Sequence, residues 1–572
     1  MKKSLRTILC LVLAISLLGV MLAGCGKAKE EEPKETPAAT EQKTETETAK
    51  AEEPAETAAD NKGEFKYSTE PVEFEAYMNY SWWKAEYPWD DNNKIAKYIK
   101  DTFGISIKWN SPGGNEDEKM NLMIATDNLP EVVIMDRNDM WKKLIELKKL
   151  VPIDDYLKKY PGISSAIPDS LMNMERIDGK MYGILNWIKT PEYLGGNGGY
   201  MINKQIYEQL GSPKLQTLDD LYAYCKKVKE SNIKVDGKSV IPLQLKRGDS
   251  LDGIFPLWTA YGEKRHNQEI SPRTNKTRPQ GSELKLTLND AKFEEYMLYL
   301  NKLYTEGLIN KDYFVETQEQ VDEKLAQGRV AVYASPDMTV QGKSAMQALK
   351  DAGAPYEYEV IEPIAAAGVD QKDIYTSTGS RLGWNIICIT NKAKDPERIY
   401  QYFDWAITPE GHRVLGFGPK GVLWNEVDEN GFPILPDDLD YTKRSNELPL
   451  GKFLLPGMTQ WYDTCKFTID QKRGKGTWES NAQNKVTFHH TYDDTEYTSV
   501  NPPAGTEEAD IDSDAAKYLT DQYTKMITAK SADEVKKFIE ETKAELYRRG
   551  FEKVEKYMTQ KWIENKQKLG IN

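Results

Sequence analysis

An alternation of strand-like and helix-like segments, beginning at residue 72, constrains the fold of this chain most. Residues 72–78 alternate apolar and polar side chains as in a half-buried strand, and residues 131–135 form a short, almost wholly apolar strand. Between them, the pattern predicts a helix over 92–102, a strand over 104–109 and a helix over 118–125. A β-α-β-α-β series of this kind predicts an α/β fold with a parallel sheet covered by helices.

Residues that follow the predicted strands are candidate ligand contacts, because open α/β sheets bind ligands beyond the carboxyl ends of their strands. Two such groups stand out: residues 79–83 (Asn-Tyr-Ser-Trp-Trp) after the first strand, and Asp136, Arg137 and Asp139 after the third.

The chain begins as a secretory signal peptide. Basic residues precede an apolar stretch over 8–20, which is shorter than the roughly 20 apolar residues needed to span a bilayer. The tetrapeptide Leu-Ala-Gly-Cys ends at Cys25 and resembles a lipobox, in which the cysteine of bacterial lipoproteins carries a diacylglyceryl group. We expect a signal peptide over 1–24 and a lipid anchor at Cys25. A cleaved signal with an incidental cysteine is the alternative.

Residues 25–66 consist almost entirely of Glu, Lys, Thr, Ala and Pro. Such a segment buries too little apolar surface to offset the entropy of ordering it, so we expect a disordered spacer. No second apolar run of spanning length follows. The body is therefore expected on the extracellular face of the cell membrane, held there by the lipid alone.

Composition narrows the function of the body. The net charge of −14 argues against nucleic acid as a partner. Cys225, Cys388 and Cys465 form neither a disulfide framework nor a CxxC motif, so we expect buried thiols. The 13 Trp and 32 Tyr together outnumber the 14 Phe, and rings with a polar edge suit a sugar ligand. Core packing is the alternative role for these rings.

Sequence blocks between about residues 70 and 430 resemble those of extracellular solute-binding lipoproteins that serve carbohydrate ABC importers, in particular the large variant of Gram-positive bacteria. The order and spacing of the blocks carry the resemblance. They are LPEVV at 129–133, LVPIDDYL at 150–157, IDGKMYGI at 177–184, YMINK at 200–204, TLDDL at 217–221, LAQGRVA at 325–331, GWNI at 383–386 and NKAKDPER at 391–398. Leu185 and Leu218 stand where relatives carry Pro and Trp, which leaves the expected fold unchanged.

The resemblance implies two α/β lobes joined by hinge strands, which close on a ligand held in a cleft between them. The N-terminal lobe is expected over 67–190 and about 384–455, and the C-terminal lobe over about 200–382 and 456–572. The first hinge crossing falls at 195–199, where four glycines permit wide backbone angles. An ordinary surface loop is the alternative for that stretch.

The resemblance also implies ligand contacts. In maltose-type relatives, residues directly after the third strand contact sugar hydroxyls, and Asp and Arg side chains form strong hydrogen bonds of this kind. Asp337 stands where relatives carry a stacking Trp. The expected contacts are Trp82, Trp83, Asp136, Arg137, Asp139, Trp258, Tyr261, Asp337, Arg381 and Trp384. For each residue alone, a place in the core or on the solvated surface is the alternative.

Neither a cofactor nor a metal ion is expected. Some relatives carry a calcium loop, but the matching stretch at 232–242 has one carboxylate and two lysines, which cannot supply six to eight oxygen ligands. The expected partners are a carbohydrate, the permease subunits of an ABC transporter and the membrane through the lipid, with the protein itself a monomer.

Two rival functions belong to other classes. A lipid-anchored glycoside hydrolase would also be rich in aromatic residues, but it needs paired carboxylates that this acidic sequence does not single out. HExxH, GxSxG and Walker A motifs are missing from the sequence. A lipoprotein that presents its ligand to a membrane sensor would use the same closed form as a transport protein.

Overall fold

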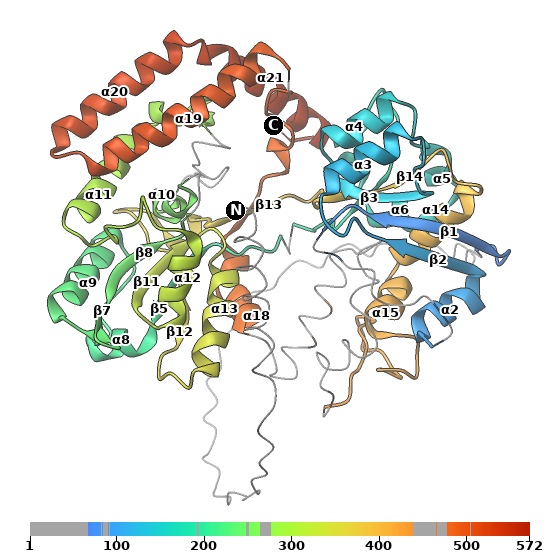
Figure 1. The fold of residues 1–572 in the computed structure, drawn as a ribbon, viewed down its shortest axis with the longest axis horizontal. Coiled ribbons are helices and arrows are strands. Elements are labelled where there is room, and N and C mark those ends of the chain that lie inside the picture. The colour runs from blue at the N-terminus through green and yellow to red at the C-terminus, as the bar shows by residue number, and fades with distance from the viewer. Residues whose placement is uncertain are drawn as a thin grey trace, which may run out of the picture. The chain divides into compact units, whose positions relative to one another are not determined.

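The computed structural model describes residues 67–571 apart from 82, 84–89, 91, 192–193, 248–250, 263–275, 438, 440–464, 466–468, 470–477 and 504. The predicted signal peptide, Cys25, the spacer and Trp82 lie outside this part of the chain. The described residues build the expected two α/β lobes (Figure 1). Within the described ranges, no helix is both long and apolar enough to cross a membrane.

The N-terminal lobe contains a five-stranded sheet with the order β2-β1-β3-β14-β4. Its strands are β1 (Val72–Met78), β2 (Ile105–Asn110), β3 (Val132–Asp136), β4 (Ile184–Asn186) and β14 (Asn385–Ile389). The first three confirm the predicted strands to within one residue. β14 returns from a distant part of the sequence and runs antiparallel between β3 and β4, with Ile387 opposite Ile134 and Ile184, so the sheet is not wholly parallel.

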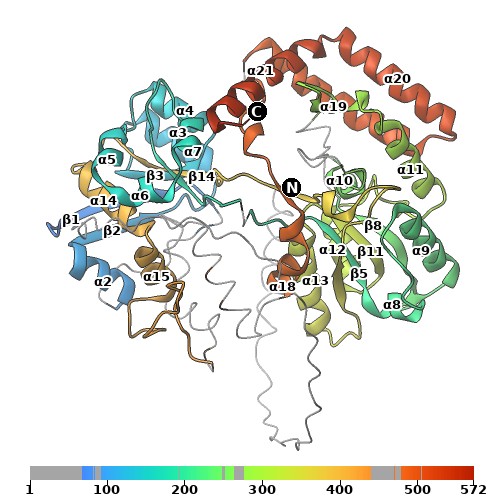
Figure 2. The ribbon, with the colours of Figure 1, turned by 180° about the vertical axis from the view of Figure 1, so that it is seen from behind.

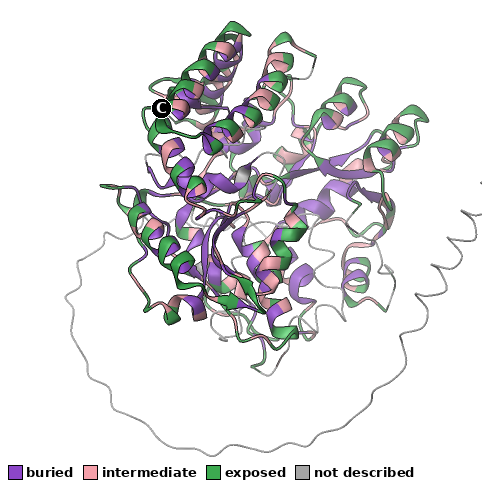
Figure 3. Ribbon diagram, turned by 60° about the vertical axis from the view of Figure 1, so that its left-hand side comes forward, coloured by how far each residue is buried: buried purple, intermediate pink, exposed green. Residues whose placement is uncertain are grey.

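Helices cover this sheet and bury its apolar strands. Val133, Ile134 and Met135 are fully buried, as the apolar run predicts, and the outward faces of the helices are exposed (Figure 3). The helices are α2 (Lys94–Phe103), α3 (Glu116–Ala125), α4 (Asp139–Glu146), α5 (Asp154–Lys159), α6 (Pro161–Ala166), α7 (Asp169–Met174), α14 (Pro396–Ala406) and α15 (Pro409–Phe417).

The C-terminal lobe contains a four-stranded sheet with the order β12-β5-β11-β8, in which β5 runs antiparallel to its neighbours. The strands are β5 (Gly199–Asn203), β8 (Ile241–Leu245), β11 (Val330–Ser335) and β12 (Tyr358–Ile361). The helices of this lobe are α8 (Lys204–Gln209), α9 (Leu218–Ser231), α10 (Phe255–Thr259), α11 (Phe293–Thr305), α12 (Gln318–Ala326), α13 (Met338–Asp351) and α18 (Trp478–Lys485). Across the two lobes, Cys225, Cys388 and Cys465 are all buried, as expected.

Three two-stranded pairs complete the sheets. They are β6 (Lys234–Val235) with β7 (Lys238–Ser239), β9 (Thr277–Gln280) with β10 (Glu283–Leu286), and β13 (Ser377–Gly379) with β15 (Thr491–Asp493). The first pair turns through the stretch that matches the calcium loop of relatives.

Three long helices end the chain: α19 (Glu507–Thr528), α20 (Ala532–Arg548) and α21 (Phe551–Leu569). α19 and α20 pack on α11 of the C-terminal lobe, and α21 packs on β10 (Figure 2). The far end of α21 also reaches α7 of the N-terminal lobe, where Lys568 Nζ donates to the carbonyl of Met174 (3.4 Å). The last helix therefore contacts both lobes.

Candidate functional site

The carboxyl edge of the N-terminal sheet gathers four side chains of the candidate site. Tyr80 follows β1, Asp136 ends β3, Trp187 follows β4 and Trp384 precedes the antiparallel β14. Because β14 runs opposite to the other three strands, all four residues fall at the same edge of the sheet. The rings of Tyr80 and Trp384 lie 5.1 Å apart, and those of Trp384 and Trp187 lie 6.2 Å apart, centroid to centroid.

The Tyr80 hydroxyl donates a hydrogen bond to Asp136 Oδ1 (2.8 Å). Burial of the ring, and then the Asp136 carboxylate, raise the pKa of Tyr80 well above its ordinary value. The hydroxyl therefore stays a donor and holds the carboxylate in place. Asp136 is otherwise exposed, so its carboxylate presents hydrogen-bond acceptors to a ligand at this edge.

Trp384 is 40% exposed, so part of this large ring is accessible to a ligand. Gly383, just before Trp384, adopts a left-handed backbone conformation (φ 65°). A Cβ at Gly383 would lie 2.0 Å from the Asn186 carbonyl oxygen, so this close approach requires glycine. The indole N–H of Trp187 is buried and has no acceptor within the described chain. Ordered water or a ligand oxygen completes such a donor.

Arg137 turns away from this surface and into the hinge. It donates to the backbone carbonyls on both sides of Trp384, namely Leu382 (2.7 Å), Gly383 (2.6 Å) and Asn385 (3.3 Å). Its Nε lies 3.2 Å from the carboxylate of Glu175, and both side chains are about nine-tenths buried. These contacts occupy most of the guanidinium donors. The predicted contact of Arg137 with a sugar stays a prediction, and its main observed role is to fix the backbone around Trp384.

The carboxyl edge of the C-terminal sheet carries an ion pair. Lys246 follows β8 and Asp337 follows β11, and their charged groups lie 2.5 Å apart. Asn197, on the first hinge crossing, joins this edge by accepting hydrogen bonds from Thr339 Oγ1 (2.6 Å) and Gln483 Nε2 (2.9 Å). The start of α13 is thus held against the hinge.

The described connections between the lobes are 187–191 with 194–198, and 376–384, and β15 lies beside them. Ser377 pairs with Thr491 in the β13–β15 ladder, and a Cβ at Gly196 would lie 2.1 Å from Thr491 Oγ1. The glycines of the first crossing therefore permit close approach as well as wide backbone angles.

Charged side chains also line these hinge segments. Arg381 Nε lies 2.7 Å from Asp493 Oδ2. Burial, with a smaller contribution from Asp493, raises the pKa of the neighbouring Asp494 carboxyl to about 6. The hinge thus contains one carboxylate paired with an arginine, Asp493, and one whose charged form is disfavoured by burial, Asp494.

Other expected contacts lie elsewhere. Trp83 is buried in the core of the N-terminal lobe against Trp109 (5.8 Å). Trp258 and Tyr261 are buried in the core of the C-terminal lobe, and Trp258 packs on the ring of Tyr296 (5.2 Å). Enclosed rings present no face to a ligand, so the core alternative describes these three better than the stacking role. Asp139 lies exposed in the first turn of α4 and pairs with Lys142 (3.3 Å).

Two residues of the site were missing from the predicted contacts. Tyr80 belongs to the stretch after the first strand, but the contacts predicted there are its neighbours Trp82 and Trp83. Trp187 follows a three-residue strand whose pattern is too short to detect, and its left-handed φ of 61° has no sequence signature in a tryptophan.

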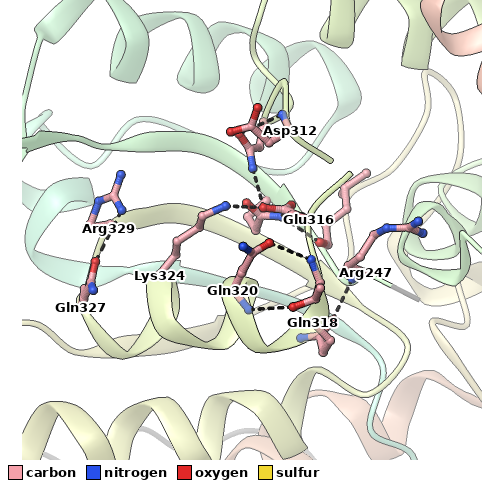
Figure 4. Close-up of polar contacts among 12 residues, drawn as sticks. Arg247, Asp312, Glu316, Gln318, Gln320, Lys324, Gln327 and Arg329 are labelled. Atoms are coloured by element: carbon pink, nitrogen blue, oxygen red, sulfur yellow. Dashed lines mark hydrogen bonds and ion pairs between the residues drawn. The ribbon is translucent and has the colours of Figure 1, made fainter. Parts of the chain in front are cut away.

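A second polar cluster lies between β8 and α12 (Figure 4), and a cavity of about 380 Å³ lies beside it. Its centre is the buried carboxylate of Glu316, which accepts from Gln244 (2.6 Å) and Asn310 (2.8 Å) and pairs with Lys324. Both oxygens of the Glu316 carboxylate already have partners within the chain, which indicates a structural role for this network. Among the described residues, no three His, Cys, Asp or Glu side chains are grouped to bind a metal ion.

Comparison with known proteins finds relatives that are named for binding saccharides. The chain is 25% identical over 336 residues to the polygalacturonan/rhamnogalacturonan-binding protein YtcQ of Bacillus subtilis, covering 57% of this chain and 62% of that protein. It is 23% identical over 338 residues to the fructooligosaccharide ABC transporter substrate-binding protein FusA of Streptococcus pneumoniae, covering 56% and 59%. The matches thus span about three-fifths of these relatives.

The fold is also similar to that of solute-binding proteins of known structure. The structure of S. pneumoniae FusA in complex with kestose superposes with a TM-score of 0.59 at 17% identity, over 87% of this chain and all of that one. The family model described as bacterial extracellular solute-binding protein matches residues 94–415, which is more than half of the chain. This chain therefore belongs to the bacterial extracellular solute-binding protein family.

Proposed function

We propose that this protein captures an oligosaccharide between its two lobes and delivers it to an ABC permease. The observation that carries the proposal is the half-open Trp384, flanked by Trp187 and Tyr80 and adjacent to the Asp136 carboxylate. An aromatic face beside fixed hydrogen-bonding groups matches a sugar ring, which is apolar on its faces and polar at its rim. The names of both relatives specify saccharides, an acidic polysaccharide for YtcQ and a neutral fructooligosaccharide for FusA, and so support a saccharide as the ligand.

Capture by closure is supported by where these groups lie. Trp384 and Trp187 border the two described connections between the lobes, so rotation at the hinge changes their surroundings directly. The Lys246–Asp337 pair at the edge of the other sheet supplies polar groups from the second lobe. The proposed location is the extracellular face of the membrane, with Cys25 as the lipid-bearing residue. The protein is proposed to act as a monomer.

A panel of oligosaccharides tests the proposal. A ligand at 100 times its Kd stabilises the folded state by about 2.7 kcal/mol, which a thermal melt detects. The same ligand should reduce the radius of gyration in small-angle X-ray scattering without oligomerisation. An unchanged scattering profile at saturation would contradict closure. Release of reducing ends from the bound sugar would instead favour the hydrolase.

A further inference from the structure

The charges at the proposed site are unequally available to a ligand. Asp136 is exposed at the edge of the N-terminal sheet, where it pairs with Asn385, the neighbour of the 40% exposed Trp384, and one of its oxygens accepts from Tyr80. A carboxylate in this position accepts hydrogen bonds from sugar hydroxyls. It cannot accept a hydrogen bond from a uronate group, because that group is also negatively charged and has no proton to donate.

Three cationic groups at the two edges and the hinge are engaged with carboxylates of the chain: Arg137 with Glu175 (3.2 Å), Lys246 with Asp337 (2.5 Å) and Arg381 with Asp493 (2.7 Å). Lys189 donates to the Gly195 carbonyl (3.4 Å), and the Arg247 guanidinium lies 6.0 Å from the centroid of the Tyr313 ring. A sugar carboxylate would have to displace one of these internal partners.

Displacement is costly at the first of these pairs. Removing Arg137 from Glu175 would leave a charge that is about nine-tenths buried without its partner. It would also release the carbonyls on both sides of Trp384 and so disturb the stacking surface itself.

From this arrangement we infer that the site takes neutral oligosaccharides and rejects those carrying uronic acid units. The inference rests on the proposed function, and it names the chemical class of the ligand within it. The Asp136 carboxylate would repel a uronate group, and the cations beside it already have partners within the chain. A repulsive group of this kind is one way in which a binding site excludes a close competitor of its ligand. The net charge of −14 acts in the same direction at long range.

Matched ligands test the inference. Gluco-, galacto-, manno- and fructooligosaccharides are titrated calorimetrically into the full chain, each beside its derivative oxidised at the primary alcohol to the carboxylate. The neutral form is expected to bind at least about tenfold more tightly than its oxidised partner, and higher ionic strength should narrow the difference. Equal or tighter binding of the oxidised forms overturns the inference and leaves the proposed function standing. Binding of no sugar in either form overturns the proposed function.

A charge-neutral variant locates the selectivity. Asp136→Asn keeps an acceptor for Tyr80 but removes the negative charge, so the preference for the neutral form should shrink at least about threefold. Asp155→Asn is the control, because it removes an equal charge from an exposed position on α5 that pairs with a solvated lysine, Lys158. It should leave the preference unchanged. An unaltered preference in Asp136→Asn, or an equal loss in the control, contradicts the role assigned to Asp136.

Discussion

The ring of Trp384 lies 6.2 Å from that of Trp187, at an interplanar angle of 36°, although the two residues belong to different connections between the lobes. Trp384 nevertheless remains 40% exposed. The two indoles are the proposed stacking surface for a sugar.

Trp384→Ala should weaken sugar binding by about 1–3 kcal/mol, by analogy with bases stacked on aromatic rings. The melting temperature of the ligand-free protein should change little, because the ring is half exposed. Calorimetry and thermal melts measure the two effects separately.

Trp258→Ala is the matched comparison, because that ring is fully buried. It should cost about 3–5 kcal/mol of stability, with little specific effect on affinity. If Trp384→Ala also proves to be only a stability variant, the site is misplaced.

Arg137→Lys should lower both stability and sugar affinity. A lysine retains a charge for Glu175 but loses the planar fork that reaches the carbonyls of Leu382 and Gly383. We expect a loss of about 1–3 kcal/mol in stability and a smaller ligand-induced change in tryptophan fluorescence. Glu175→Gln leaves those carbonyl bonds in place and should affect the fluorescence change less. Wild-type affinity in Arg137→Lys would show that the guanidinium does not position Trp384.

Asp494 should make stability depend on pH. Its carboxyl pKa is raised to about 6 by burial, against about 3.9 in an unfolded chain. Between these values the folded chain holds a proton that the unfolded chain has released, so stability falls as pH rises toward 6 and is flat above it. The difference between the pKa values of the folded and unfolded chain corresponds to roughly 3 kcal/mol.

Asp494→Asn should therefore stabilise the protein at pH 7 by up to about 3 kcal/mol, and the gain should vanish toward pH 4. Denaturant unfolding between pH 4 and 8 measures the difference. A difference that stays constant across this range would mean that the carboxylate is not destabilised in the folded state. Asp155→Asn supplies the baseline for an exposed carboxylate.

Cys25→Ala should release the protein from the membrane fraction or leave it as an unprocessed precursor. The basis is the lipobox, in which the cysteine is the only residue able to receive the lipid. Fractionation after a high-salt wash, with immunoblotting for size, reports the outcome. A fully processed variant that stays on the membrane would rule out the anchor.

Local patterns predicted the first half of the N-terminal lobe well. The alternation at β1 and the apolar run at β3 reflect which side chains face the core, and that information is contained in a few adjacent residues. The pairing of β14 between β3 and β4 is of another kind, because it depends on segments far apart in the sequence. Only the resemblance to known proteins indicated that the chain returns to this lobe.

The candidate site was predicted only in part, because it also depends on contacts between segments far apart in the sequence. Asp136 and Trp384 lie together as their positions at strand ends and hinge suggested, with Trp187 supplied by a strand too short to recognise. The rings of Trp258 and Tyr261 have the composition of a sugar platform, but their neighbours Phe293 and Tyr296 enclose them. Which face of a ring is covered is decided by tertiary packing, which sequence spacing does not encode.

The contact of α21 with both lobes has a mechanical consequence. Asn565 of this helix donates to the carbonyls of Glu496 and Thr498, just past the hinge strand β15, while Lys568 reaches Met174 on α7. The proposed lobe closure would move the end of α21 across α7 or break that contact. The strength of the contact at the last turns of the chain would then contribute to the energy difference between the open and closed arrangements.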